Sequence, residues 1–112
     1  MKWLWEKFEC YREKKYLMFK DRYHPAVKKD LKKLDTTVLN DINAEWIPKL
    51  LKDPYRGESL SGYLTGIRSF HFKNRATDYR IAYHINENEQ IVNVLMVGKR
   101  ESFYQILKRR LK

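Results

Sequence analysis

Residues 78–85, DYRIAYHI, constrain the fold more than any other stretch, because their side chains alternate between two faces. The odd-numbered positions are large and apolar, from Tyr79 to Ile85, whereas Arg80, Ala82 and His84 occupy even-numbered positions. Neighbouring side chains of a strand point to opposite faces, so one face can join a core while the other carries a charge. We expect this strand to span 78–86, between strand candidates at 67–73 and 90–97. The polar turn ENE joins the last two as a hairpin, which predicts a small antiparallel sheet.

The N-terminal half supplies a further strand and helices to cover the sheet. Residues 1–15 predict a helix, and the aromatic-rich residues 16–23 predict a first strand. A helix should follow through residue 34, because Pro25 suits the first helical position, where its missing N–H needs no partner. The next helix carries apolar residues four apart and then meets Pro48, which is expected to kink or split it.

The C-terminal half alternates loop, strands and helix. Residues 52–66 are loop-like, and residues 91–97, IVNVLMV, are apolar on both faces, as expected of a central strand. A last helix is predicted from about Arg100, with an apolar stripe that includes Phe103 and Leu107. The order of elements predicts an α+β fold in which helices pack on a small antiparallel sheet.

The charge of the chain indicates the kind of partner. The chain has 24 Lys and Arg against 14 Asp and Glu, a net charge of +10. A field of this sign attracts nucleic acid, an anionic membrane surface or an acidic protein, and composition does not choose among them. Four lysines on the first predicted helix form a solvated face suited to steering toward RNA: Lys28, Lys29, Lys32 and Lys33.

The cysteine count and the N-terminal residues indicate the compartment. A single cysteine, Cys10, excludes an internal disulfide and a cysteine-based zinc site. Charged residues such as Glu6 and Lys7 interrupt the position where a secretion signal needs an apolar stretch, and no apolar run is long enough to cross a bilayer. A cytoplasmic protein without membrane contact is therefore expected.

Several cationic side chains should gather on the Arg80 side of the sheet. A register that buries Phe70 and Phe72 with the apolar face of residues 78–86 turns the intervening residues toward Arg80. The last helix adds residues at i, i+4 and i+8, away from its apolar stripe. The predicted cationic patch contains His71, Lys73, Arg80, Arg100 and Tyr104, with Ser69 on the same face of the sheet and Lys108 next on the helix.

Four segments in series resemble the RelE/ParE superfamily of toxins from type II toxin–antitoxin systems. They are YHPAVKKDLKKL, LLKDPYRGESLSG, DYRIAY and VLMVGKRESFYQILKRR, in the order and spacing of that superfamily, and the resemblance covers about residues 17–111. The resemblance implies a four-stranded sheet with two N-terminal helices on one face and a C-terminal helix, here a domain at 16–112. Residues 1–15 lie outside the family pattern and are expected to form an added helical extension.

The resemblance also implies partners and an activity. It implies a cognate antitoxin that wraps the toxin, and a toxin–antitoxin complex that can bind operator DNA through the antitoxin. For the RelE branch it implies growth inhibition through cleavage of messenger RNA in the ribosomal A site, without metal or cofactor. In that reaction a 2′-hydroxyl attacks the adjacent phosphodiester, which requires a base, an acid and cations for the crowded negative charge.

The motifs carry the expected roles onto particular residues. Arg80 matches the arginine that stabilises the phosphate, Arg100 the arginine after the central strand, and Tyr104 the tyrosine of the last helix. RelE places two lysines on the strand before its YR motif, where this chain has Ser69 and His71. Histidine titrates near neutrality, so His71 is the candidate acid or base, unless Tyr104 carries the proton. RNA contacts are assigned to Arg68, Lys73, Arg75, Lys99 and Lys108.

Other interpretations of these residues stay open. Arg80 would be structural if it bound backbone or a carboxylate, and Tyr104 would be if it only packed its helix. His24 is expected to cap the first helix and His84 to lie on the solvated strand face; no spacing supports a metal site. At the level of function, the alternatives are a ParE-like toxin that inhibits DNA gyrase without catalysis, and an inactive toxin fold that only binds its antitoxin.

Overall fold

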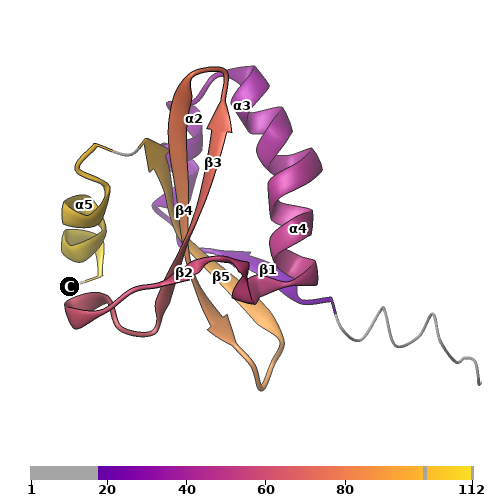
Figure 1. Cartoon of the computed structure of the whole chain (residues 1–112), viewed down its shortest axis with the longest axis vertical. Helices are drawn as coiled ribbons and strands as arrows, with labels where there is room; N and C mark the ends of the chain where they lie inside the picture. The colour runs from indigo at the N-terminus through magenta and orange to yellow at the C-terminus, as the bar shows by residue number, and fades with distance from the viewer. Residues whose placement is uncertain (1–17, 100, 112) are drawn as a thin grey trace, which may run out of the picture.

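A computed structural model describes residues 18–99 and 101–111, and its centre is a five-stranded sheet with the order β1-β5-β4-β3-β2 (Figure 1). The strands are β1 (Lys20–Tyr23), β2 (Glu58–Ser59), β3 (Ile67–Asn74), β4 (Thr77–Asn86) and β5 (Ile91–Lys99). The expected helical extension at 1–15 lies outside the described residues. The α+β class predicted from the order of elements is confirmed.

The helices lie close to their predicted positions. They are α2 (Val27–Lys32), α3 (Thr36–Asp41), a π-helical segment η1 (Ile42–Trp46), α4 (Ile47–Lys52) and α5 (Phe103–Arg110). The N-cap of α2 is Ala26 and not His24 as expected; Nδ1 of His24 accepts the N–H of Ala26 at 3.0 Å, in the turn before the helix. The predicted disturbance at Pro48 is the π-helical segment directly before it, because a proline cannot supply the N–H that a regular helix needs there. No helix within the described residues has the length and hydropathy to span a membrane.

The sheet differs from the expectation in two ways. It is mixed rather than wholly antiparallel, because β1 pairs in parallel with β5, in the register Lys20↔Ile91 to Tyr23↔Val94. The long helical connection after β1 permits this pairing, which a hairpin would not. The predicted loop at 52–66 also contributes a fifth strand, β2, which pairs antiparallel with the start of β3. Both differences depend on strand pairing over long sequence distances, which local residue patterns do not encode.

The two faces of the sheet are covered by different helices. Helices α2 to α4 cover one face and bury the odd-numbered side chains of β4, including Ile81 and Tyr83, together with Phe72 (Figure 1). The predicted register of β3 is therefore confirmed. Helix α5 covers part of the opposite face, over Ala82 and Met96. The remainder of that face, beside α5, is where the polar side chains of β3 and β4 lie.

A buried ion pair fixes α5 to the edge of β5. Strand β1 covers β5 only as far as Val94, and the β4–β5 register skips Leu95 as a bulge. Beyond this point Asp30 of α2 accepts the N–H of Val97 at 3.1 Å, and Arg110 of α5 donates to the carbonyl of Leu95 at 3.0 Å. The two side chains bind each other through two hydrogen bonds of 2.7 and 2.9 Å, and these raise the pKa of Arg110. Open backbone groups at the sheet edge are thereby satisfied.

Helix α5 begins at Phe103, three residues later than the predicted start near Arg100. Ser102, immediately before it, has a φ of 56°, in the left-handed region that a helix cannot include. The delayed start sets which turn of α5 reaches the sheet. Its first turn carries Tyr104 over the polar side chains of β3 and β4.

Candidate active site

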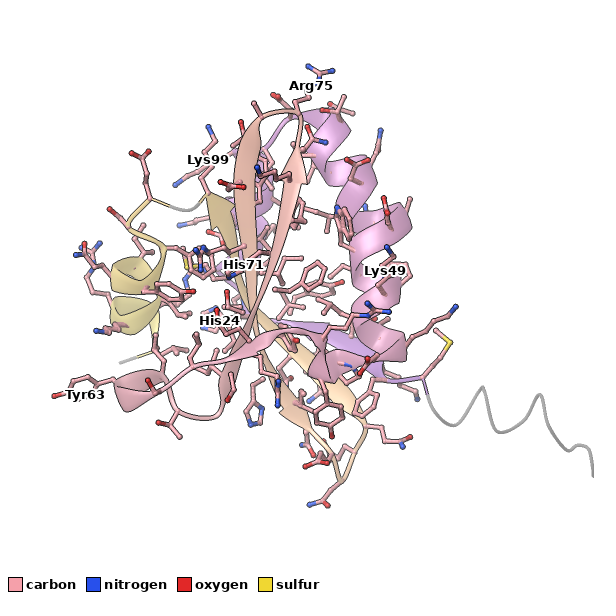
Figure 2. The ribbon with its side chains drawn as sticks, in the orientation of Figure 1. His24, Lys49, Tyr63, His71, Arg75 and Lys99 are labelled. Carbon is pink, nitrogen blue, oxygen red and sulfur yellow. The ribbon has the colours of Figure 1, made fainter. Side chains whose placement is uncertain are left out.

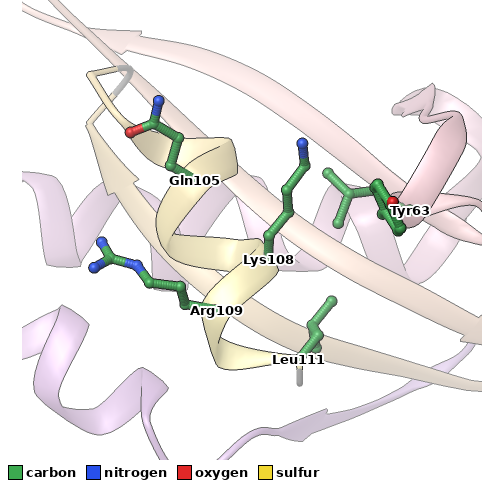
Figure 3. Close-up of a pocket in the computed structure, with 6 residues that line it drawn as sticks. Tyr63, Gln105, Lys108, Arg109 and Leu111 are labelled. Atoms are coloured by element: carbon green, nitrogen blue, oxygen red, sulfur yellow. The ribbon is translucent and has the colours of Figure 1, made fainter.

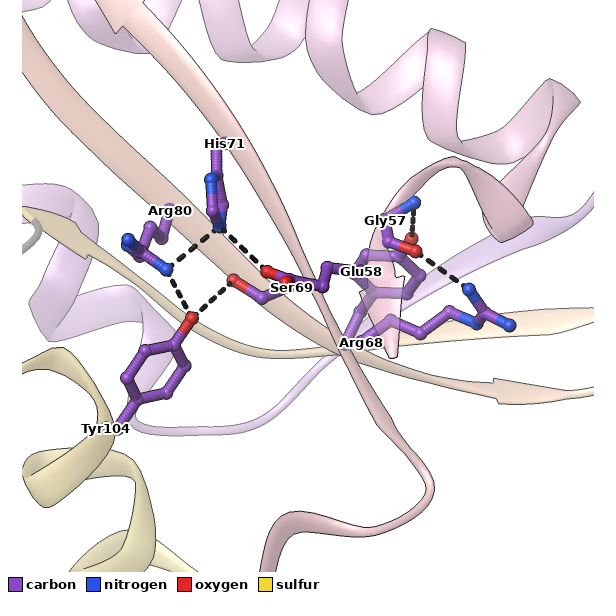
Figure 4. Close-up of polar contacts among 8 residues, drawn as sticks. Gly57, Glu58, Arg68, Ser69, His71, Arg80 and Tyr104 are labelled. Carbon is purple, nitrogen blue, oxygen red and sulfur yellow. Dashed lines mark hydrogen bonds and ion pairs between the residues drawn. The ribbon is translucent and has the colours of Figure 1, made fainter. Parts of the chain in front are cut away.

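Arg80, His71 and Tyr104 meet on the α5 side of the sheet (Figure 4). Nη1 of Arg80 lies 2.8 Å from Nε2 of His71, and the same nitrogen donates to the hydroxyl of Tyr104. The guanidinium carbon also lies 5.1 Å from the centre of the Tyr104 ring. The Tyr104 hydroxyl is 3.5 Å from Oγ of Ser69, which is buried. Three residues predicted to act together are thus in direct contact.

Strand register and one helical turn explain how these residues come together. His71 of β3 lies directly opposite Arg80 of β4 in the antiparallel ladder, so their side chains share a face. Tyr104 reaches them from the first turn of α5, which is held by buried Phe103 next to it. The three side chains therefore depend on the sheet register and on the docking of α5, both of which are fixed by the core.

The hydrogen bonds leave part of the Arg80 guanidinium unused. Both contacts use Nη1, and no other residue in the described part of the chain hydrogen-bonds this side chain. The Nη2 and Nε donors are therefore available to an oxyanion, in the fork geometry that matches phosphate. A hollow of about 300 Å³ lies beside them, lined by His71, Asp78, Tyr79 and Arg80. The arrangement is suited to holding a phosphate against the histidine ring.

The His71 ring lies beside a guanidinium and a carboxylate. Nε2 lies 2.8 Å from Nη1 of Arg80 and 3.8 Å from Oε1 of Glu58. A guanidinium only donates hydrogen bonds, so Nε2 accepts from Arg80 in the tautomer that has its proton on Nδ1. A carboxylate in this position would pair with the ring once it is protonated.

Glu58 was not among the residues predicted from the sequence. It belongs to the stretch predicted as a loop, and it reaches His71 only because β2 pairs Glu58 with Ser69, two residues away on the same face of β3. No local pattern marks it, since the signal is a pairing between segments. Glu58 is an addition that the structure makes to the candidate site.

A buried tyrosine holds the segment that carries Glu58. Tyr83 of β4 donates to the carbonyl of Pro54 at 2.5 Å and accepts the N–H of Gly57 at 2.9 Å. A Cβ at Gly57 would lie 2.3 Å from the Tyr83 hydroxyl, so only glycine fits there. Burial raises the pKa of Tyr83, so its hydroxyl remains protonated and able to donate. The contact joins the DPYRG and YRIAY segments physically.

The residues assigned to RNA contact are dispersed (Figure 2). Lys73 lies 4.0 Å from Asp78, Arg75 forms the β3–β4 turn, and Lys99 is exposed at the end of β5. Lys108 lies one helical turn beyond Tyr104 on α5. Arg68 is on the opposite face from Arg80 and donates to the carbonyl of Gly57 at 2.7 Å. The structure does not bring Arg68 into contact with His71, Arg80 and Tyr104.

Two further expectations bear on the site. Arg100, the fourth predicted catalytic residue, lies outside the described residues. His84 is exposed on its strand, as expected. Across residues 18–99 and 101–111, no three His, Cys, Asp or Glu side chains are grouped so that they could hold a metal ion.

Sequence comparison places the chain in a family. The family described as ParE-like toxin of type II bacterial toxin–antitoxin system matches residues 22–108. This match covers most of the chain, so the protein belongs to this family of toxins. The predicted superfamily is therefore confirmed. No curated protein matches the chain at a significant level.

Solved structures share the fold. The toxin–antitoxin complex RelBE2 from Mycobacterium tuberculosis matches at 28% identity with a TM-score of 0.63, over 74% of this chain and 99% of that one. The free E. coli toxin RelE, as a mutant, matches at 23% identity with a TM-score of 0.65, over 85% and 99%. The intact E. coli RelBE complex matches at 24% identity with a TM-score of 0.59, over 74% and 98%. The chain is thus a type II toxin with a RelE-like fold.

Proposed function

We propose that this toxin is an endoribonuclease that cuts translated messenger RNA at the ribosome. The proposed reaction is attack of a ribose 2′-hydroxyl on the adjacent phosphorus, with departure of the 5′-oxygen of the next nucleotide and formation of a cyclic phosphate. The observation that carries this proposal is the Arg80 guanidinium, held between His71 and Tyr104 with two donors available beside a hollow.

Each side chain of the cluster has a place in that reaction. Arg80 binds the phosphate and offsets the additional negative charge that develops during attack. His71 accepts the 2′-hydroxyl proton on Nε2 when the phosphate draws Arg80 away, and Glu58 then pairs with the charged ring. We assign donation of a proton to the leaving oxygen to the Tyr104 hydroxyl, which contacts the same guanidinium. Arg100 is proposed as a further cation from the resemblance alone.

The decisive experiment replaces Arg80. Arg80→Ala should reduce cleavage of ribosome-bound mRNA by about 100-fold or more and abolish growth inhibition, because an oxyanion donor contributes on this order. Arg80→Lys should recover only part of the activity, since an ammonium cannot form the two-pronged contact. Primer extension on ribosome-bound mRNA measures both. Arg22→Ala, which removes an exposed arginine from β1, is the matched control. Full cleavage by folded Arg80→Ala would refute the assignment.

We further propose a cognate antitoxin as the partner, in the cytoplasm. RelBE2 and RelBE, which share this fold, were solved as toxin–antitoxin complexes. The net charge of +10 favours an acidic antitoxin, whose binding would block the approach of RNA. The complex would bind operator DNA through the antitoxin. A small acidic protein should co-purify with the toxin when the native operon is expressed.

Inhibition of DNA gyrase is the second candidate function, because the matching family is described as ParE-like. The two candidates differ in the cellular response to induction of the toxin. Cleavage of reporter mRNAs within codons supports the endoribonuclease, whereas a DNA-damage response with intact mRNA supports gyrase inhibition. Neither response, with antitoxin binding retained, would indicate an inactive toxin fold.

A further inference from the structure

A groove separates the loop before β3 from helix α5 (Figure 3). Its volume is about 740 Å³, within the roughly 300–1,000 Å³ of ligand-binding sites. The lining residues are Tyr63, Leu64, Gln105, Lys108, Arg109 and Leu111. None of the six is acidic, and two are cationic. The candidate active site does not use this groove, and of its residues only Lys108 was predicted to bind RNA.

Tyr63 is presented to solvent by a hydrogen-bonded turn. It lies in the 3-10 segment η3 (Gly62–Leu64), and its side chain is 94% exposed. The adjacent Leu64 is buried under α5, and Oγ1 of Thr65 donates to the carbonyl of Gly62 at 2.7 Å. Gly62, with a φ of 66°, makes the turn possible. The fold therefore fixes the backbone on both sides of an aromatic ring that adds nothing to the core.

The surroundings of Tyr63 favour a nucleic acid over other polyanions. Nζ of Lys108 lies 5.8 Å from the centre of the Tyr63 ring, and Arg109 follows on the same helix. Cations that track a phosphate backbone, next to an aromatic ring on which a base can stack, are the combination by which proteins bind single-stranded RNA. An acidic peptide would use the cations, but only a nucleic acid carries a base that can stack on the ring at every residue.

Helix α5 and the segment that begins with β2 contribute both to the candidate active site and to the groove. Lys108 lies one helical turn beyond Tyr104, on the same face of α5. Along the other wall, Tyr63 lies five residues after Glu58. Two neighbouring segments thus lead from the Arg80 cluster to the groove. An RNA strand with a phosphate at Arg80 can follow them.

We propose that this groove binds single-stranded RNA next to the cleaved phosphate, with a base stacked on Tyr63 and phosphates contacted by Lys108 and Arg109. The proposal rests on the proposed function, which it extends by a second subsite for the substrate. Single-stranded rather than duplex RNA is expected because stacking on Tyr63 requires an unpaired base.

Binding of an uncleavable RNA tests the groove separately from catalysis. The probe is a fluorescent single-stranded oligonucleotide with 2′-O-methyl groups throughout, and binding to the full chain is followed by anisotropy. Tyr63→Ala should weaken binding roughly 5- to 100-fold, the range for loss of one stacked base, while Tyr63→Phe should retain it. Tyr63→Leu should bind like Tyr63→Ala, because it keeps an apolar side chain without a ring. Tyr63 is so exposed that none of these changes should impair folding.

The electrostatic contribution of Lys108 to RNA binding is tested separately. Lys108→Ala should reduce the slope of log affinity against log salt by about 0.7, the value for one lost contact to a single strand. Lys49→Ala is the matched control, because Lys49 also lies over an aromatic ring, that of Trp46 at 4.9 Å. It should leave the slope unchanged, because Lys49 is on α4, on the other side of the molecule from the groove (Figure 2). Equal effects of the two changes would mean that only net charge matters, which would contradict the proposal.

The remaining outcomes separate the groove from the reaction. If adding Tyr63→Ala to an Arg80→Ala chain does not weaken binding of the probe further, the groove proposal is overturned, whatever the cleavage activity. Conversely, a Tyr63 effect on binding in a chain that does not cleave RNA would support the groove and refute only the proposed reaction. If Tyr63→Ala binds the probe normally but escapes neutralisation by the antitoxin of its operon, the groove is a protein-docking surface and our proposal is wrong.

Discussion

Three arginines near the sheet have different partners. Arg110 of α5 binds the buried carboxylate of Asp30, and Arg68 of β3 binds the backbone carbonyl of Gly57. Among the described residues, Arg80 hydrogen-bonds only the side chains of His71 and Tyr104, and keeps further donors available. A structural arginine in a folded chain is normally neutralised or bound to backbone acceptors. Within the described residues Arg80 hydrogen-bonds neither a carboxylate nor a backbone carbonyl, which favours the proposed binding of phosphate.

The identity of the proton carrier can be decided by two substitutions. His71→Gln should reduce cleavage by about 10²–10⁴-fold, because it removes the proposed base while keeping a polar side chain. Tyr104→Phe should cost less, since the ring stays over Arg80 and only the hydroxyl is lost. Single-turnover cleavage of ribosome-bound mRNA by each folded variant gives the two rates. The reverse order of effects would assign the proton transfer to Tyr104.

At the scale of elements, the sequence predicted what local patterns encode. The alternation of residues 78–86 and the need to bury Phe70 and Phe72 predicted that His71 lies on the same face as Arg80, and the structure pairs the two residues directly. The parallel β1–β5 pair and strand β2 were missed, because both depend on pairings across many residues. Glu58 was missed for the same reason. Sequence patterns thus predicted that residues of β3, β4 and α5 contribute to the site, whereas the contribution of β2 was found only in the structure.

A further prediction concerns the segment that carries Glu58, which Tyr83 holds in place. Tyr83→Phe removes one oxygen atom and leaves the N–H of Gly57 and the carbonyl of Pro54 without their partner. The free energy of unfolding should fall by about 1–3 kcal/mol, the cost of an unsatisfied buried polar group. Urea unfolding measures this change. Tyr55→Phe is the matched control, because the exposed Tyr55 hydroxyl bonds only the side chain of Glu87, and the change should cost far less. Equal losses would mean that Tyr83 does not anchor this loop.

At the scale of the whole molecule, positive charge is distributed over both sides of the sheet. The candidate site, the Tyr63 groove and the basic last turn of α5 lie on one side (Figures 2 and 4). Helix α2 lies on the other and exposes four lysines: Lys28, Lys29, Lys32 and Lys33. A substrate contacted only at the active site would not touch α2. A ribosome is large enough to contact both sides. Weaker binding after substitution of the α2 lysines would therefore indicate a partner of that size.

Reversal of those four lysines to glutamate should therefore weaken ribosome binding and make it less dependent on salt. Each lost phosphate contact reduces the slope of log affinity against log salt by about 0.7–0.9, so the loss of four contacts should lower the slope by up to about 3.6. The fold should persist, because all four side chains are exposed. Co-sedimentation with ribosomes over a series of salt concentrations measures the slope, and the single-stranded RNA probe measures the active-site side independently.

The control for this reversal carries the same change in net charge at another place. Four exposed cationic residues on β1 and α4 serve this purpose: Lys20, Arg22, Lys49 and Lys52. If α2 contacts ribosomal RNA directly, its reversal should reduce the salt slope much more than the control, because a long-range field is shared by both variants. Equal effects would mean that α2 only contributes to the overall field. Ribosome binding that is insensitive to salt, together with tight binding to gyrase, would instead favour the gyrase-inhibiting function.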